Sequence, residues 1–211
     1  MRDTCSVSIE EADISVAHPY PAQVEFHGDR HITRWHPLVQ WLLAIPQLMI
    51  ASSLRSLRQV LLLISLFTVL FTERIPRPVF DTIAMSYRYE WRAMSYAMFL
   101  HEDYPPFDFQ PTAEDDGVEA HTTLSIAYPE RLNRWKPLYK WFLAIPHYFV
   151  LAVLFVGAAF GFLGGFVAVL VTGEYPEELR SFLVGVYRYA IRVEAYVGLL
   201  TDSYPPFRLG A

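Results

Sequence analysis

The stretch RWHPLVQWLLAIP (residues 34–46) returns almost unchanged as RWKPLYKWFLAIP (residues 134–146), one hundred positions later. The motifs YRY (residues 87–89) and YPPF (residues 104–107) return at the same offset. Because separate clusters align in one register without gaps, we interpret the chain as a tandem duplication.

The repeat divides the 211-residue chain into four segments. We expect a polar N-terminal tail (1–21), a first module (22–109), an acidic linker (110–121) and a second module (122–211). Each module opens with a short alternating run, AQVEFHG or TTLSIAYP, whose period of two predicts a β-strand. Two helical segments follow, and each module ends in YPPF and a short extended tail. We expect that tail to pair with the leading strand of the same module.

The composition favours a membrane protein. Hydrophobic residues make up 53% of the chain, and charged residues only 18%, against about 25% in soluble domains. A net charge of −5 argues against a nucleic-acid partner, which calls for a basic surface. A single cysteine excludes an internal disulfide.

The second module has no charged residue from Trp141 to Gly173. This run exceeds the roughly 18 apolar residues that indicate a transmembrane helix. In the first module, Arg55 and Arg58 interrupt the equivalent run, and a charge at mid-bilayer costs about 2.5–3.5 kcal/mol. Two interpretations remain: a tilted span followed by a second helix that crosses back, or a hairpin followed by an interfacial second helix.

The predicted fold is therefore mainly α-helical and integral to the membrane. It consists of two tandem homologous modules, each a membrane helical pair or a hairpin plus an interfacial helix, with a small β element formed by its N- and C-terminal strands. We expect the modules to lie parallel, with a pseudo-twofold axis along the membrane normal.

The repeated phrase has the composition of a membrane-entry segment. Tryptophan prefers the headgroup level, and lysine and arginine mark the cytoplasmic flank. We expect a multi-pass protein of the cytoplasmic membrane with a cytoplasmic N-terminus, and helix kinks at Pro46 and Pro146. The expected interface anchors are Arg34, Trp35, Trp41, Arg134, Trp135, Lys136 and Trp141.

Arginines in apolar segments are the best binding candidates, because charges at membrane depth tend to mark a headgroup, anion or partner site. The candidates for lipid or partner binding are Arg55, Arg58, Arg88, Arg92, Arg188 and Arg192. His147 is a weak metal candidate. No carboxylate or thiol pattern completes a site around His27, His31 and His36, so we expect neither a metal nor a cofactor.

These motifs together resemble a family of bacterial membrane proteins known only as domain of unknown function 4389. The resemblance is strongest over residues 122–209. It rests there on Arg134, Trp135, Pro137, Trp141, Pro146, His147, Tyr175, Pro176, Arg188, Arg192, Tyr196, Tyr204, Pro205 and Pro206. The first copy departs by placing Gln47, Arg55 and Arg58 within the apolar run. The resemblance implies an integral protein of the bacterial inner membrane with tandem domains, and it implies no reaction.

The chain contains no Gly-rich phosphate loop, nucleophile elbow, HExxH or CxxC motif. We therefore expect a non-enzymatic accessory or scaffold subunit that binds membrane lipids, a partner membrane protein or a second copy of itself. One alternative is a small transporter or channel-like protein with intramembrane arginines. A more distant one is a lipid-modifying enzyme that uses His147 or the pair Glu177 and Glu178.

Overall fold

The computed structural model describes residues 20–28 and 31–210. Within that part the chain is mostly helical, with one small antiparallel sheet. The first module contributes β1 (Ala22–Phe26), α1 (His36–Thr72) and α2 (Arg77–Ala97). The second contributes β2 (Thr122–Ile126), α3 (Pro137–Leu143), α4 (Ile145–Thr172) and α5 (Glu177–Val197).

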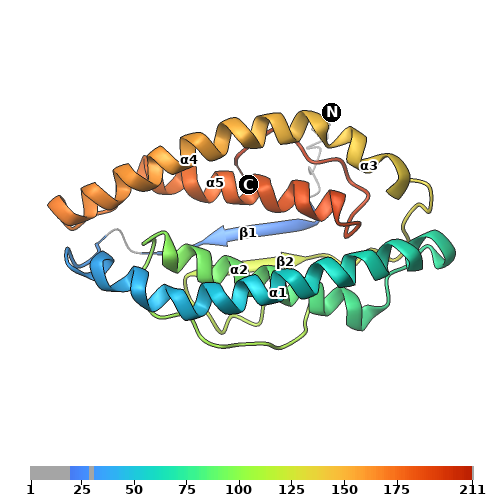
Figure 1. Ribbon diagram of the computed structural model, residues 1–211, viewed down its shortest axis with the longest axis horizontal. Helices are drawn as coiled ribbons and strands as arrows, with labels where there is room; N and C mark the ends of the chain where they lie inside the picture. Colours follow the sequence, from blue (N-terminus) through green and yellow to red (C-terminus); the bar gives the residue numbers. More distant parts are fainter. Residues whose placement is uncertain (1–19, 29–30, 211) are drawn as a thin grey trace, which may run out of the picture.

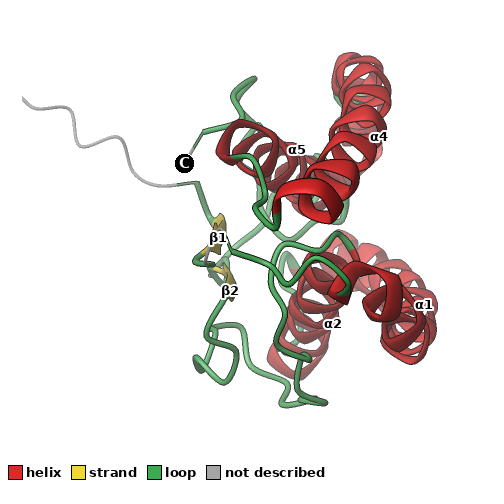
Figure 2. Ribbon diagram, turned by 90° about the vertical axis from the view of Figure 1, so that its left-hand side faces the viewer, coloured by secondary structure: helices red, strands yellow, loops and turns green. Residues whose placement is uncertain are grey.

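The elements form three layers. The long helices α1 and α4 lie on one face, α2 and α5 lie in the middle, and the two strands cover the opposite face (Figure 2). Along the long axis, α1 and α4 run in opposite directions, and each is followed by its shorter return helix (Figure 1). The layering leaves α1 and α4 covered on one side only.

The long helices end in the same way. Glu73 and Gly173 both adopt the left-handed conformation, and the backbone N–H of each donates to the carbonyl of residue 69 or 169. The two prolines at which kinks were expected have different surroundings. Pro46 lies inside the continuous helix α1, whereas the second copy is interrupted at Ala144, so that Pro146 sits in the first turn of α4.

The strands do not pair within each module, so the predicted β element of each module is wrong. Instead β1 pairs with β2 in one antiparallel sheet. The alternating sequences put Ala22 and Val24 on the same buried face as Leu124 and Ile126, so the pairing completes one apolar layer. The second module's C-terminal tail has a different partner, because its Leu209 carbonyl accepts a hydrogen bond from Arg188.

The register of this sheet identifies the symmetry of the molecule. Val24 pairs with Leu124, its own equivalent one hundred residues later. The pseudo-twofold axis therefore passes through this pair, perpendicular to the strands, and equivalent helices run antiparallel (Figure 1). The prediction that the modules lie parallel is wrong, because equivalent antiparallel strands need an axis that reverses the chain direction.

Each strand packs on the return helix of the other module. Nε of Arg88 in α2 donates to the carbonyl of Leu124 at 3.3 Å, and Nε of Arg188 in α5 donates to that of Val24 at 2.9 Å. The helices themselves meet where Trp91 stacks on Tyr187, with ring centroids 4.3 Å apart. The two modules consequently share one core.

The return helices α2 and α5 are buried on both sides, so the alternative with an interfacial second helix does not fit. In α4, glycines allow close packing without a break. A Cβ at Gly165 would lie 2.2 Å from the ring of Tyr175, and one at Gly157 would lie 3.2 Å from Phe182. The helix runs straight through both positions.

Candidate functional site

The most unusual surface of the molecule is the outward side of α1, α3 and α4. Both α1 and α4 are long and apolar enough to cross a membrane, and only 17% of the most apolar 18-residue window of each is buried. Most of each helix is therefore not part of the protein's own core. Large apolar side chains are exposed along their whole length, including Leu42, Phe67, Phe149 and Phe160.

The expected interface anchors lie on this surface, but the two repeated phrases lie at opposite ends of it. Trp35, Trp41, Trp135 and Trp141 are all more than half exposed. Each phrase begins beside the end of the other module's long helix. Glu73, which caps α1, accepts a hydrogen bond from Arg134 at 2.8 Å.

The remaining basic anchors differ from one another. Lys136 donates to the Asp202 carbonyl at 3.1 Å. Arg34 lies against Gly173, so that a Cβ there would be 3.4 Å from its side chain. Both repeated phrases are thus tied to the end of a neighbouring helix as well as to the exposed face.

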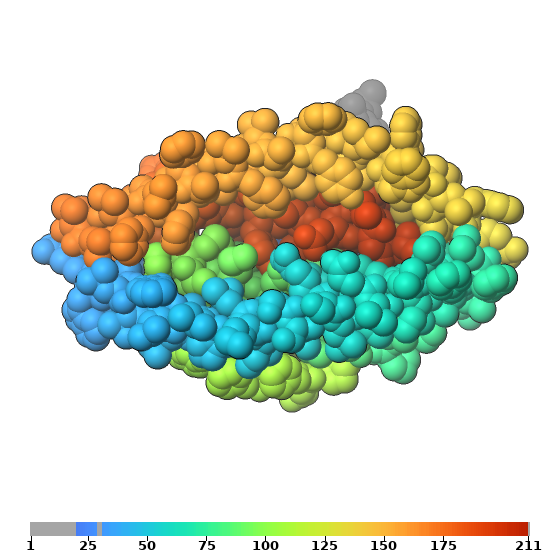
Figure 3. All heavy atoms as spheres, viewed as in Figure 1, coloured from blue at the N-terminus to red at the C-terminus, as the bar shows by residue number. Residues whose placement is uncertain are grey.

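A groove of about 770 Å³ opens between the two long helices. Figure 3 shows it as a furrow between α4 and α1, with α5 and α2 recessed on its floor. Apolar side chains from both walls line it, among them Leu62, Leu66, Leu151 and Phe155. The groove is therefore continuous with the exposed apolar face.

A cluster of four charged residues lies at this groove, of which Arg55, Arg58 and Glu194 line it. Arg58 is 4% exposed, and its Nη2 lies 2.6 Å from Oε2 of Glu90, which is 8% exposed. Arg55 also bonds to Glu90, and Glu194 lies 3.9 Å from Arg58. The Arg58 guanidinium stacks over the ring of Tyr87 at 3.7 Å. Half of the Arg55 side chain and almost half of Glu194 remain exposed to the groove.

The place that is equivalent to the groove by the twofold symmetry is filled by aromatic side chains. There Phe99 packs on Phe162 and Phe166, with ring centroids 5.4 and 5.5 Å apart. The equivalents in the groove are the smaller Leu199, Leu62 and Leu66. The charged cluster is likewise absent from the second copy, where Phe155, Ala158, Ala190 and Met94 stand for Arg55, Arg58, Glu90 and Glu194. The groove is a specialisation of one half of a duplicated fold.

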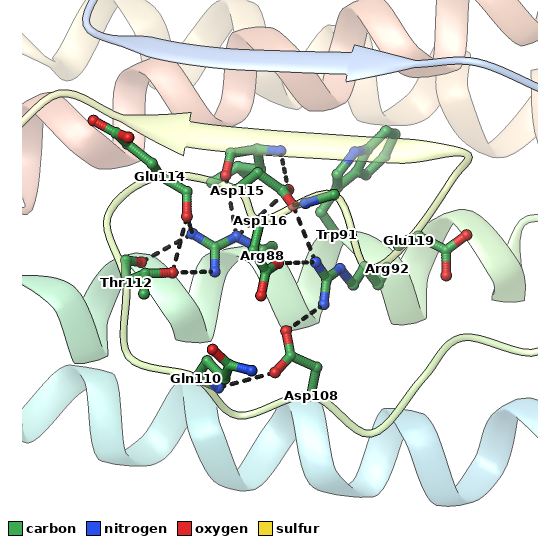
Figure 4. A network of polar contacts seen from close by, with 12 residues as sticks. Arg88, Trp91, Arg92, Asp108, Gln110, Thr112, Glu114, Asp115, Asp116 and Glu119 are labelled. Carbon is green, nitrogen blue, oxygen red and sulfur yellow. Dashed lines mark hydrogen bonds and ion pairs between the residues drawn. The ribbon is translucent and has the colours of Figure 1, made fainter.

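Two further candidates, Arg88 and Arg92, point away from this face toward the acidic linker (Figure 4). Arg88 donates to the carbonyls of Thr112 and Glu114 at 2.9 and 2.7 Å. Arg92 pairs with Asp108 at 2.9 Å and with Asp115 at 3.1 Å. Burial lowers the pKa of Arg88, and the neighbouring Asp115 opposes that shift. Both arginines attach the linker to α2.

Arg188 and Arg192 hold the second module's tail in the same way, but through backbone groups. Arg188 donates to the Leu209 carbonyl at 3.1 Å, and Arg192 to that of Arg208 at 3.3 Å. Of the six candidate arginines, the structure brings Arg55 and Arg58 together on Glu90, and Arg88 and Arg92 together on Asp115.

His147 is fully buried. Its Nδ1 lies 2.5 Å from the Tyr189 hydroxyl, and its ring stacks on Phe207 at 4.2 Å. Its equivalent, Gln47, bonds to Tyr89 and donates to the Pro105 carbonyl at 2.8 Å. Both side chains thus fix a YPPF tail against a long helix. Within the described residues, His147 belongs to no cluster of potential metal ligands.

The two carboxylates considered for lipid chemistry, Glu177 and Glu178, lie in the first turn of α5. Glu177 pairs with Arg180 at 2.6 Å, and acidic side chains at this position stabilise a helix N-terminus.

Sequence reasoning did not find the cluster of His101, Glu119 and His121, whose potential ligand atoms all lie within 4.8 Å of one another. His101 follows α2, whereas the other two belong to the linker, so no short spacing motif joins them. The direction in which the linker folds back decides this meeting, and composition alone does not predict it.

The chain belongs to the family described as "Domain of unknown function (DUF4389)", whose model matches it twice, over residues 34–108 and 134–208. The double match confirms the tandem duplication and the resemblance. Neither match includes β1 or β2, so the unit that the family shares is a long helix, its return helix and the YPPF tail. No curated protein and no solved structure matches the chain.

Proposed function

We propose that this protein is a non-enzymatic membrane protein embedded in one leaflet, with α1 and α4 parallel to the membrane plane, and that it holds a phospholipid in the groove between them. The observation that carries the proposal is the separation of its two faces. Exposed apolar side chains gather on the long helices, and the strands and the acidic linker lie on the opposite side (Figure 2).

An apolar surface of this extent needs a partner, because monomeric soluble proteins rarely expose contiguous patches above a few hundred Å². Tryptophans at both ends of the face suit the headgroup level, where one edge of the ring is wet. Arg34 and Arg134 lie beside them and can reach lipid phosphates.

The polar groups on the sheet side favour an orientation in which α1 and α4 lie parallel to the membrane plane. The strands lie alongside the middle of the long helices (Figure 1). Gln23 and Glu25 in β1, and Glu114 and Asp116 in the linker before β2, are exposed. If α1 and α4 crossed the bilayer, these groups and the open strand edges would face hydrocarbon. Each such charge costs about 2.5–3.5 kcal/mol at the bilayer centre, and lipid-exposed sheet edges do not occur there. With the helices flat, the same groups face water.

The groove fits one kind of ligand. Its walls are apolar, and Arg55 and Glu194 offer a cation and an anion beside the buried Arg58–Glu90 pair. A phospholipid matches this pattern, because the groove opens on the face that we place in the leaflet. Its phosphate would bind Arg55, and its acyl chains would lie against Leu62, Leu151 and Phe155.

Transport is less well supported. A transport pathway lined by intramembrane arginines would bring Arg55, Arg88 and Arg188 into one channel. Arg88 and Arg188 instead bond to strand carbonyls on the opposite side of α2 and α5. A partner membrane protein or a second copy could also cover the apolar face, and these are alternative outcomes of the following test.

Depth measurements distinguish a flat protein from a spanning one. Cys5 is replaced by serine, and single cysteines carrying an environment-sensitive fluorophore are introduced at exposed positions that share one face of each helix. These positions are Leu42, Val60 and Phe67 in α1, and Phe149, Phe160 and Val167 in α4. The protein is reconstituted into vesicles of phosphatidylethanolamine and phosphatidylglycerol, and quenching by lipids spin-labelled at different depths is recorded.

A flat protein gives one similar, shallow depth for all three probes of each helix, and a probe at Gln110 in the linker stays accessible to an aqueous quencher. A spanning helix gives its deepest probe in the middle and puts its two ends on opposite sides of the bilayer. That graded pattern would overturn the proposed orientation. Probes on α1 and α4 that no lipid quencher reaches would show instead that protein covers this face.

A further inference from the structure

The end of α2 and the linker meet in a compact group of nitrogen and oxygen donors. His101 and Glu119 are buried, His121 is partly buried, and one potential ligand atom from each lies within 4.8 Å of the others. The two imidazole rings stack with centroids 4.8 Å apart. This cluster is separate from the groove, and the proposed lipid function does not use it.

The hydrogen bonds of His101 determine which nitrogen is free. The Ser95 hydroxyl donates to the Arg92 carbonyl at 3.0 Å and lies 3.0 Å from Nε2 of His101. When the hydroxyl proton is used in the bond to Arg92, Nε2 carries the imidazole proton and donates to Ser95. In this tautomer Nδ1 of His101 holds the lone pair, and it is buried with no hydrogen-bond partner among the described residues. A buried, unpartnered lone pair is costly unless a ligand completes it.

The other two donors are held in place by their neighbours. Nε2 of His121 lies 2.7 Å from Oδ2 of Asp103, and its Nδ1 lies 2.9 Å from the His27 carbonyl. Oε1 of Glu119 accepts the His121 backbone N–H at 3.3 Å. Both ring nitrogens of His121 are therefore engaged, and a metal would replace one of these two contacts.

We propose that His101, Glu119 and His121 bind Zn²⁺. Two imidazoles and one carboxylate match the ligands that this ion takes in proteins, and they leave a fourth position open for water or for Asp103. The second module has Thr201 in place of His101. The ion would tie the linker to the end of α2 in the first module only.

Zinc binding is measured on the full chain in mild detergent, stripped with a chelator and titrated with Zn²⁺ against a chromophoric competitor. The key variant is Glu119→Gln, which keeps an oxygen for the His121 N–H but removes the charge. His121→Ala removes a second ligand. His31→Ala is the matched control, because His31 is exposed at the same end of the molecule and lies outside the cluster.

We expect one equivalent of zinc for the parent chain and for His31→Ala, and at least about tenfold weaker binding for the other two variants. Zinc should raise the unfolding temperature of the parent, since a ligand that binds only the folded state stabilises it. Glu119→Gln should unfold like the parent when the chelator is present and should not respond to zinc. The proposal is overturned if the parent binds no zinc, or if Glu119→Gln and His121→Ala bind as tightly as the parent does.

Discussion

At the scale of single residues, the ion pair between Arg58 and Glu90 gives the sharpest prediction. Both side chains are more than nine-tenths buried. Removing one partner of a buried pair leaves an uncompensated charge and costs about 3–5 kcal/mol. We therefore expect Glu90→Ala to lower the free energy of unfolding by about that amount, measured by denaturant titration in detergent.

The second module supplies the control for this measurement, because Ala158 and Ala190 occupy the equivalent positions. The double variant Arg58→Ala/Glu90→Ala reproduces that apolar arrangement and should lose much less stability than the sum of the two single changes. If the double variant loses as much stability as the two single variants together, the two residues do not interact.

The sequence identified Arg55 and Arg58 as costly charges in an apolar helix, but it did not identify their partner. Glu90 lies 32 residues after Arg58 on the return helix, and their contact depends on the register between α1 and α2. Glu194 approaches Arg58 from the other module. A pairing between two helices or two modules leaves no pattern in the local sequence. A charged residue within an apolar run, in contrast, is visible in the sequence alone.

At the scale of elements, the long helices were predictable because an uncharged run from Trp141 to Gly173 has few structural alternatives. The difference between the two equivalent prolines was not predictable. Pro46 and Pro146 occupy matching places, yet one lies within a continuous helix and the other begins one. The strands were correctly expected in position, but their pairing partner was wrong, since alternation specifies a buried face and not which strand lies beside it.

The groove between α1 and α4 can be filled by copying the other half of the molecule. In the double variant Leu62→Phe/Leu199→Phe, two phenylalanines replace the leucines that leave the groove open, as Phe162 and Phe99 already do in the second copy. We expect phospholipid that co-purifies with the protein to fall several-fold, measured by native mass spectrometry, with little change in unfolding temperature.

Leu42→Phe is the matched control, because it adds the same ring to an exposed position of α1 outside the groove. It should retain as much lipid as the parent chain. Unchanged lipid retention in the double variant would place the bound lipid elsewhere on the apolar face.

At the scale of the whole molecule, the duplication has produced one folding unit. Each strand is carried by one module and packs on the return helix of the other, through the bonds of Arg88 to Leu124 and of Arg188 to Val24. Sequence comparison within the chain revealed the two modules, but it could not show that they exchange strands. The exchange depends on an antiparallel register centred on Val24 and Leu124.

Strand exchange predicts that neither half folds alone. A chain of residues 1–109 keeps α1, α2 and β1, but it lacks β2, which covers Arg88, and Tyr187, which covers Trp91. Produced separately in detergent, each half should show no cooperative thermal transition as a monomer by circular dichroism. Mixed or co-expressed halves should associate through a tag on one of them and regain the transition, because the pairing of β1 with β2 and the stacked aromatic pair return together. A monomeric half that unfolds cooperatively would mean that the packing within one module is sufficient, and the shared core would then be a docking surface between two independent domains.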